Sequence, residues 1–227
     1  MVSTARIHAV LTGDVVDSSR LELDQRAYLA TRFDTLSAPI LKAFGEDILP
    51  LGMETIRGDG FQALLGRPEM ALRISIFVRA SLRADARSGH ADVRIAVGIG
   101  TVEFIGSRVS EGLGPAYELS GKRLDQMKRG ERLGIESELP GFDVENWDVI
   151  AALIDVLAAS WTPKQAHAVE LALQGMTQEA IARTWEVPIK QQTVGNHLKR
   201  AGWGAIRQAL ERFEYSVIKL LNHKTAE

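Results

Sequence analysis

Two aspartates beside glycines are the side chains of this sequence best suited to chemistry. Asp14 follows a short apolar run, RIHAVL, and Asp59 lies within the tripeptide Gly-Asp-Gly. Two carboxylates held close together repel each other unless a divalent cation neutralises them. Mg²⁺ or Mn²⁺, bridged by carboxylate and phosphate oxygens, is the usual solution. Such a pair can position a nucleoside triphosphate for phosphoryl transfer.

This hypothesis makes Asp14 and Asp59 the metal ligands of a site that also holds a nucleotide. The flanking residues Gly13, Arg57 and Gly58 are then expected to contact the nucleotide. A plainer interpretation stays open, because Gly-Asp and Asp-Gly are ordinary turn sequences in which the aspartate only caps the turn. We favour ligand binding, since both aspartates are expected at the same end of adjacent strands.

A second group of polar side chains lies near the end of the sequence. After Pro188, the apolar residues Val194 and Leu198 stand four apart, which predicts a helix that begins at Lys190 or Gln191. Gln and Asn can pair with adenine through two hydrogen bonds, and Lys and Arg reach guanine or phosphates. The side predicted to face double-stranded DNA consists of Lys190, Gln191, Gln192, Thr193, Asn196, His197, Lys199 and Arg200. The alternative is a helical bundle used only for dimerisation.

Two further helices are expected before this one. Thr162 and Pro163 open the first helix, and Gly175 ends it. Thr177 caps the second helix, whose Ile181 and Trp185 are expected to point inward. Three helices in this order predict a helix-turn-helix unit.

The elements that must position the two aspartates come earlier in the chain. The periodicity of apolar residues predicts a strand, a helix, two strands joined by the Asp-Gly turn, a helix, a strand and a third helix. This order is that of the split βαβ, or ferredoxin-like, arrangement, with its helices on one face of an antiparallel sheet. The predicted ranges are 6–11, 24–44, 53–57, 61–65, 68–88, 92–101 and 115–128.

A change of composition marks the expected domain junction. The segment 130–147 contains three glycines, a proline and mixed acidic residues, which interrupt any long period. We therefore predict an α+β domain over residues 1–145 and an all-α helix-turn-helix domain over residues 146–227, which begins with a short apolar helix at 149–159.

Composition limits the partners of the chain. The net charge is −2, but nine Lys or Arg face six Asp or Glu from Trp161 onward, so the basic charge gathers at the end that is expected to bind DNA. The sequence contains no cysteine, which excludes disulfides and thiolate metal sites and fits a reducing cytoplasm. We predict no membrane-spanning segment, and we predict a homodimer, because helix-turn-helix proteins commonly read two half-sites.

Several stretches of the sequence resemble known families. LTGDVVDSSR and IRGDGFQALL are similar to the metal-binding elements of class III nucleotide cyclases and of diguanylate cyclases, although Gly60 stands where the latter have an acidic residue. TQEAIARTWEVPIKQQTVGNHLKRAGW resembles the helix-turn-helix of sigma-factor region four and LuxR-type regulators, with a turn about two residues longer. Together with VRIAVGIGTV and LGPAYELSGKRLD, these stretches make nearly the whole chain resemble the SatD family.

The cyclase resemblance also implies positions for the groups that bind ribose and phosphate. Class III cyclases place an Asn and, four residues later, an Arg on the helix after the last core strand. Glu118 and Lys122 stand at these positions, so the resemblance implies that a negative charge is near the triphosphate, offset by Lys122 and Arg123. This departure favours a protein that binds a nucleotide over one that cyclises it.

Two functions therefore follow from the sequence. The first is a transcriptional regulator whose affinity for DNA responds to a nucleotide or metal near Asp14 and Asp59. The alternative is a nucleotide cyclase or nucleotidyl-transfer enzyme that uses Mg²⁺ bound by these aspartates. The enzyme needs a group that stabilises the transferred phosphate, whereas the regulator needs only different ligand affinities in two conformations.

Overall fold

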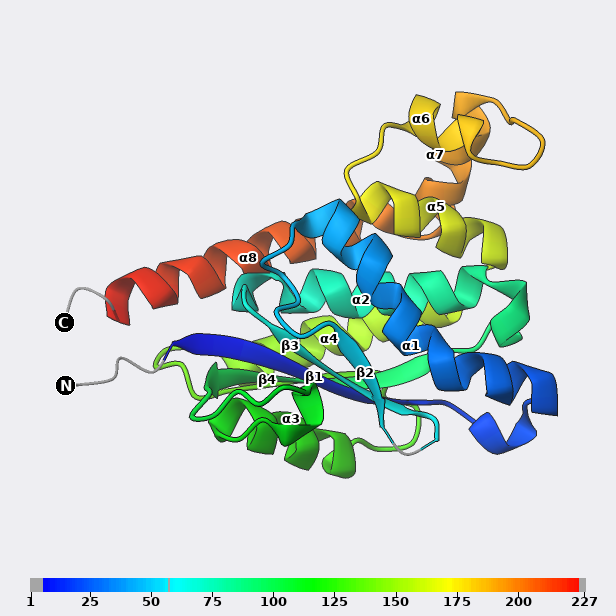
Figure 1. Ribbon diagram of the computed structural model, residues 1–227. Coiled ribbons are helices and arrows are strands. Elements are labelled where there is room, and N and C mark those ends of the chain that lie inside the picture. The colour runs from blue at the N-terminus through cyan, green and yellow to red at the C-terminus, as the bar shows by residue number, and fades with distance from the viewer. Residues whose placement is uncertain (1–5, 57, 225–227) are drawn as a thin grey trace.

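A computed structural model describes residues 6–56 and 58–224 (Figure 1). In this part of the chain, the strands form one sheet in the order β2-β3-β1-β4-β5. The mixed α+β class predicted from the sequence is confirmed. The strands span Ile7–Val15 (β1), Met53–Ile56 (β2), Gly60–Leu65 (β3), Val93–Thr101 (β4) and Leu133–Ser137 (β5).

The first four strands follow the predicted split βαβ order. β1 is central and runs antiparallel to both β3 and β4, while β2 pairs antiparallel with the outer side of β3. β5 pairs with β4 in parallel, which requires the crossover made by the helix between them. The sheet is therefore a four-stranded antiparallel unit with one added parallel strand.

Helices cover both faces of the sheet, and not one face as predicted. α1 (Leu23–Phe44), α2 (Ala71–Ala84) and α4 (Val144–Ala159) share one core with alternate residues of β1, whereas α3 (Pro115–Gln126) covers the other face (Figure 1). The reason lies in the apolar residues of the strands, because Val10 and Leu64 point away from the main core and pack with Ala116 of α3.

Two strands differ from the sequence prediction. β1 was predicted to stop at Leu11 but continues to Val15, because Thr12 to Asp14 still pair with both neighbouring strands. Asp14 therefore lies inside a strand and not in a loop. β5 falls within the segment predicted as the domain junction, where buried Leu133 and Ile135 alternate around Gly134 and pair with β4.

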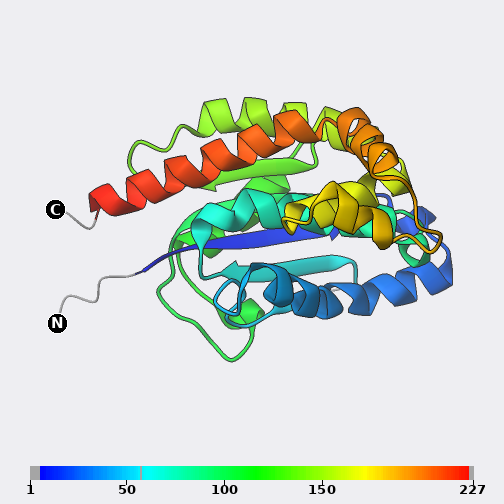
Figure 2. The same cartoon turned by 90° about the horizontal axis from the view of Figure 1, so that it is seen from above.

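The remaining helices pack against the sheet domain and against one another. α5 (Pro163–Leu173) lies on α2, while α6 (Gln178–Arg183) and α7 (Gln191–Arg200) pack together at one end of the molecule. α8 (Trp203–Lys224) returns along α4 (Figure 2). The Trp161 indole N–H donates to the Ala201 carbonyl at 2.9 Å, which holds the α4–α5 connection against the start of α8.

The predicted boundary between residues 145 and 146 falls in the first turn of α4. Residues on both sides of it belong to one hydrophobic core. Arg73 of α2 pairs with Glu214 of α8 at 2.6 Å, and Phe213 of α8 packs edge-on against Trp147 of α4. Among the described residues, the segments before and after position 145 are thus held together by apolar packing and by an ion pair.

Candidate functional site

The structure brings Asp14 and Asp59 together at one edge of the sheet. Asp14 stands opposite Gly60 in β3 and opposite Arg94 in β4. The Val15 N–H donates to the Asp59 carbonyl at 3.2 Å, so the β2–β3 turn is fastened to the end of β1. Both aspartates line an open cleft of 670 Å³.

Asp14 is held by an arginine that the sequence analysis did not single out. The Arg94 guanidinium donates from Nε to Oδ1 at 2.9 Å and from Nη2 to Oδ2 at 2.5 Å. This two-point contact raises the pKa of Arg94 above its ordinary value, chiefly through the hydrogen bonds to Asp14. A cation that binds Asp14 must therefore compete with a guanidinium already in place.

Asp59 is held by a different kind of partner. The Ser18 hydroxyl, in the short 3₁₀ turn Ser18–Arg20, donates to its Oδ2. Asp17 precedes this turn and also lines the cleft, with φ of 52° in the left-handed region that few non-glycine residues adopt. The chain after β1 is thus bent back toward the β2–β3 turn.

Basic side chains outnumber acidic ones around the cleft. Arg94 and the three aspartates are joined there by Lys128, Arg129 and Arg132, which come from the segment before β5. Within the described residues, Lys128 and Arg129 have no ion-pair partner. The cleft can therefore attract an anion such as a phosphate group.

The carboxylates of the cleft do not make a full metal cage by themselves. No group of three or more His, Cys, Asp or Glu side chains is arranged to hold a metal ion in residues 6–56 and 58–224. Mg²⁺ and Mn²⁺ accept phosphate oxygens and waters beside one or two carboxylates. Asp14 and Asp59 therefore fit a cation that arrives with a nucleotide better than a permanently bound ion.

The other residues predicted to bind the nucleotide lie apart from the aspartates. Lys122 pairs with Glu118 at 3.2 Å on the exposed side of α3, and Arg123 donates to Glu131 and Asp148. Neither of these two basic residues lines the cleft. The predicted contact Arg57 lies outside the described residues.

The glycines have backbone roles at this site. A Cβ at Gly13 would lie 2.4 Å from the Arg94 carbonyl oxygen, so only glycine lets β1 pass this point. Gly58 adopts φ of 85°, which the turn before Asp59 requires. Both glycines shape the strand edge that carries the aspartates.

The basic residues of the cleft carry only a weak signal in the sequence. Arg94 stands between buried Val93 and Ile95, at the outward position of an alternating strand, and Lys128 and Arg129 are adjacent before Gly130. Such positions are usually solvated, and only the tertiary structure places them beside Asp14.

The second group of predicted site residues lies on one side of α7. Lys190 precedes the helix as its N-cap residue, Val194 and Leu198 are buried, and the predicted polar residues other than His197 are exposed. Within the described chain, the side chains of Lys190, Lys199 and Arg200 make no ion pair. The expected exposure of this face is confirmed, and its role in DNA binding stays a prediction.

His197 is the half-buried member of this face. Its ring stacks on Trp185 with centroids 6.0 Å apart, and Trp185 also meets His167 edge-on. Burial lowers the pKa of His197 below its ordinary value, and the positive charges of Lys164 and Arg200 act in the same direction. Both effects favour the neutral form of the His197 ring.

The turn before α7 is long but anchored. It runs from Thr184 to Lys190, and the Ile189 N–H donates to the Ala182 carbonyl of α6 at 3.2 Å. The Thr177 hydroxyl accepts from the Ala180 N–H at the start of α6. The end of α6 is thus tied to the turn before α7, and its start is capped.

Comparison with known proteins gives a distant structural likeness. No protein-family model matches the chain, and no curated protein matches it. A solved bacterial light-regulated adenylyl cyclase matches with 18% identity and a TM-score of 0.42, over 57% of this chain and 42% of that protein. The match thus spans less than half of that protein, and at this distance it carries no argument about function. None of the described helices has the length and apolar character needed to cross a membrane.

Proposed function

We propose that the protein binds double-stranded DNA through α7 and that a nucleotide with a divalent cation, held in the cleft, changes this binding. The observation that carries the proposal is the exposed side of α7, whose cations have no partner among the described residues. On this view, α6, the anchored turn and α7 form a helix-turn-helix unit with α7 as its recognition helix.

The chemistry of the α7 face suits the major groove. α7 has ten residues and is about 15 Å long, and a helix with its side chains is about 10–12 Å across, which fits a major groove about 12 Å wide. Gln192 and Asn196, four residues apart, can pair with adenine, while Lys199 and Arg200 reach guanine or phosphates. These four side chains form no hydrogen bond or ion pair among the described residues, so they lose no internal bond when they bind DNA.

A physical connection between the cleft and the helical unit supports the second part of the proposal. Arg132 lines the cleft, and its backbone N–H donates to Asp155 of α4 at 2.7 Å. Asp155 also accepts from Arg79 of α2 at 2.5 Å, and α2 is the helix on which α5 lies. A ligand that moves the segment 128–132 therefore acts on the helices that carry α7.

An enzyme is the second candidate function. The adjacency of Asp14 and Asp59 favours metal-assisted nucleotidyl transfer, as in the cyclases that the sequence resembles. The pairing of Lys122 with Glu118 counts against it, because the charge expected to stabilise the transferred phosphate already has a partner. We therefore rank binding ahead of turnover.

The test measures fluorescence anisotropy of labelled duplex DNA over a range of salt. Each phosphate contact contributes about 0.9 to the slope of log K against log salt concentration, so Lys199→Ala/Arg200→Ala should lower the slope by up to about 2. Lys42→Ala removes an exposed lysine of α1 that has no ion pair among the described residues, and it should change nothing. Wild-type protein without salt-dependent binding, or equal slopes for all three proteins, would remove the DNA proposal.

The same assay tests the response to ligand. ATP or GTP with Mg²⁺ or Mn²⁺ should change the affinity of the wild type for DNA and leave that of Asp59→Ala unchanged. Asp47→Ala, an exposed aspartate outside the cleft, serves as the matched control. Chromatography of the nucleotide after incubation separates the candidates, because a cyclic or transferred product would establish the enzyme.

A further inference from the structure

The outward face of α4 is apolar although it faces solvent. Val149, Leu153 and Val156 are 61%, 62% and 72% exposed, and Ala152 and Ala159 between and beyond them are also exposed. The inward side of the same helix is apolar as well, with Trp147, Ala151, Ile154 and Ala158 buried. A helix that is apolar on all sides is typically covered on all sides.

The charged residues in this part of α4 point elsewhere. Asp155 is buried against Arg79, and Asp148 pairs with Arg123 of α3 at 3.2 Å. From residue 146 to residue 159, the exposed face of α4 therefore carries no charge. The three large apolar residues are spaced four and three apart, which is the spacing of the contact seam in paired helices.

We propose that this face binds the same face of a second copy of the chain, with the two α4 helices antiparallel about a two-fold axis near Leu153. The charges at the ends of the face are complementary in this arrangement. Asp143 and Glu145 are exposed before Leu153, and Lys164 is exposed after it. In the described chain, none of these three forms an ion pair.

An antiparallel pair brings the acidic end of each copy to the basic end of the other. Glu145 lies eight residues before Leu153 on α4, and Lys164 is the second residue of α5, which follows the carboxyl end of α4. Antiparallel helices also align their dipoles favourably. A two-fold contact needs one self-complementary patch, and this face provides it.

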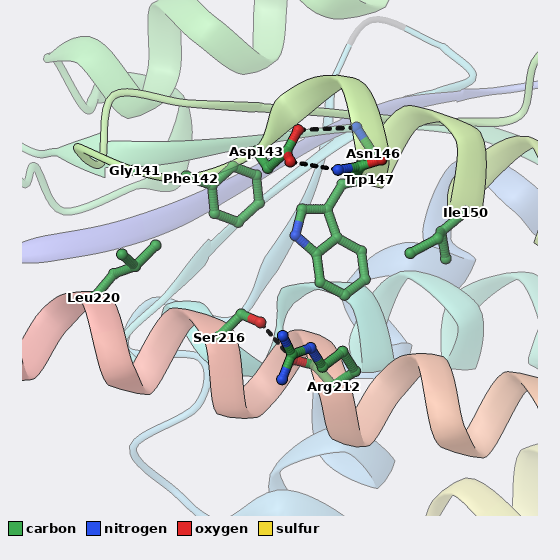
Figure 3. Close-up of a pocket in the computed structure, with 9 residues that line it drawn as sticks. All are labelled: Gly141, Phe142, Asp143, Asn146, Trp147, Ile150, Arg212, Ser216 and Leu220. Carbon is green, nitrogen blue, oxygen red and sulfur yellow. Dashed lines mark hydrogen bonds between the residues drawn. The ribbon is translucent and has the colours of Figure 1, made fainter.

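The proposed contact extends from α4 toward α8. α4 has 16 residues, which gives a face about 24 Å long. A groove of 270 Å³ between α4 and α8 widens this face, with Trp147 and Ile150 opposite Arg212 and Ser216 (Figure 3). A stable interface buries roughly 800 Å² per partner, so the proposed contact includes side chains of α8 beside the groove as well as the face of α4.

This inference goes beyond the proposed function and is tested without DNA. If both hold, a dimer supplies the two recognition helices that paired half-sites need. A protein that dimerises through α4 and ignores DNA would contradict only the DNA proposal. A monomer that binds DNA would contradict only the dimer proposal.

The absence of cysteine from the sequence gives a direct probe. Leu153→Cys introduces a single thiol next to the proposed axis, and mild oxidation should convert most of the protein to a disulfide-linked dimer. Leu23→Cys, on the 76% exposed first residue of α1, is the matched control and should cross-link only slowly. Equal cross-linking of the two variants would overturn the proposal.

Analytical ultracentrifugation provides the second measurement. The wild type should sediment as a dimer, and Leu153→Glu should weaken association at least about tenfold, because a carboxylate would be buried in an apolar contact. Leu23→Glu should leave association unchanged, and circular dichroism should show that both variants are folded. A monomeric wild type, or a dimer that Leu153→Glu does not weaken, would refute the proposed interface.

Discussion

The two candidate sites differ in whether their charged side chains have partners within the described protein. In the cleft, Asp14 is held by Arg94 and Asp59 by Ser18, so the acidic groups have partners before any ligand arrives. On α7, Lys199 and Arg200 have no ion-pair partner in the described chain and face solvent. A ligand of the cleft must displace or join the existing partners of the aspartates, whereas a ligand of α7 breaks no ion pair of Lys199 or Arg200.

The largest expected effect concerns the most deeply buried paired charge. Arg79 of α2 is fully buried and contacts Asp92 and Asp155. Burial opposes its charge, but the two carboxylates together hold the pKa of Arg79 above its ordinary value. Arg79→Met should lower the free energy of unfolding by about 3–5 kcal/mol, because it leaves the buried Asp155 without its cation and Asp92 with Arg83 alone.

Denaturant titration followed by circular dichroism measures this change. Lys199→Ala is the control and should alter the free energy of unfolding by less than about 0.5 kcal/mol, because its side chain makes no ion pair in the described structure. Equal losses for the two variants would show that the paired charges of the sheet domain do not stabilise it more than the unpaired charges of α7.

An intermediate effect, on the affinity for Mn²⁺, is expected when the ion pair between Arg94 and Asp14 is removed. Arg94→Ala removes the guanidinium that occupies Asp14, and the two aspartates of the cleft then repel each other. Because the pair is partly exposed, its contribution is on the order of 1 kcal/mol, and Mn²⁺ should bind about fivefold more tightly. Titration calorimetry with Mn²⁺ alone measures the change.

Arg26→Ala is the matched control for this experiment. It removes an exposed arginine of α1 outside the cleft, so the affinity for Mn²⁺ should stay that of the wild type. Unchanged affinity in Arg94→Ala as well would mean that Asp14 is not a metal ligand, and the turn interpretation of the two aspartates would then be preferred.

The smallest expected effect concerns His197, the half-buried member of the α7 face. Its pKa is lowered in the free protein by burial and by Lys164 and Arg200, and DNA phosphates would raise it. Binding should therefore take up a proton. The gain appears as the pH falls through the pKa of His197 in the complex and is complete below its pKa in the free protein.

Anisotropy titrations at several pH values measure this dependence. The affinity for DNA should rise by about two- to fivefold toward acidic pH in the wild type. His197→Gln keeps a polar side chain without the titration and should bind with little pH dependence in this range. If both proteins show the same dependence, His197 does not face the phosphates.

The sequence predicted the α7 face well because its pattern is local. Val194 and Leu198 fix the buried side of α7, Pro188 limits where the helix can begin, and the observed start at Gln191 agrees. The Asp-Gly turn predicted the β2–β3 hairpin for the same reason. Neighbours in sequence determine these features.

The parts that were missed depend on distant contacts. β5 has only five residues, and Gly134 stands between its two large apolar residues, so the sequence shows no clear period there. Pairing with β4 makes this segment a strand. Arg94 looked like a solvated position of a strand because its partner, Asp14, lies 80 residues away. The placement of α3 on the opposite face likewise depends on how the strands are ordered.

The carboxylate of Asp155 connects α4 to two other parts of the molecule. It accepts hydrogen bonds from Arg79 and from the backbone N–H groups of Arg132 and Leu133, so one side chain of α4 ties together a helix and the strand beside the cleft. A shortened chain that stops before α4 would leave Arg79 with Asp92 as its one carboxylate partner among the described residues, and would remove the acceptor of the Arg132 and Leu133 N–H groups. Deletion of α4 is therefore expected to disturb the sheet more than deletion of α6 and α7, none of whose residues lines the cleft.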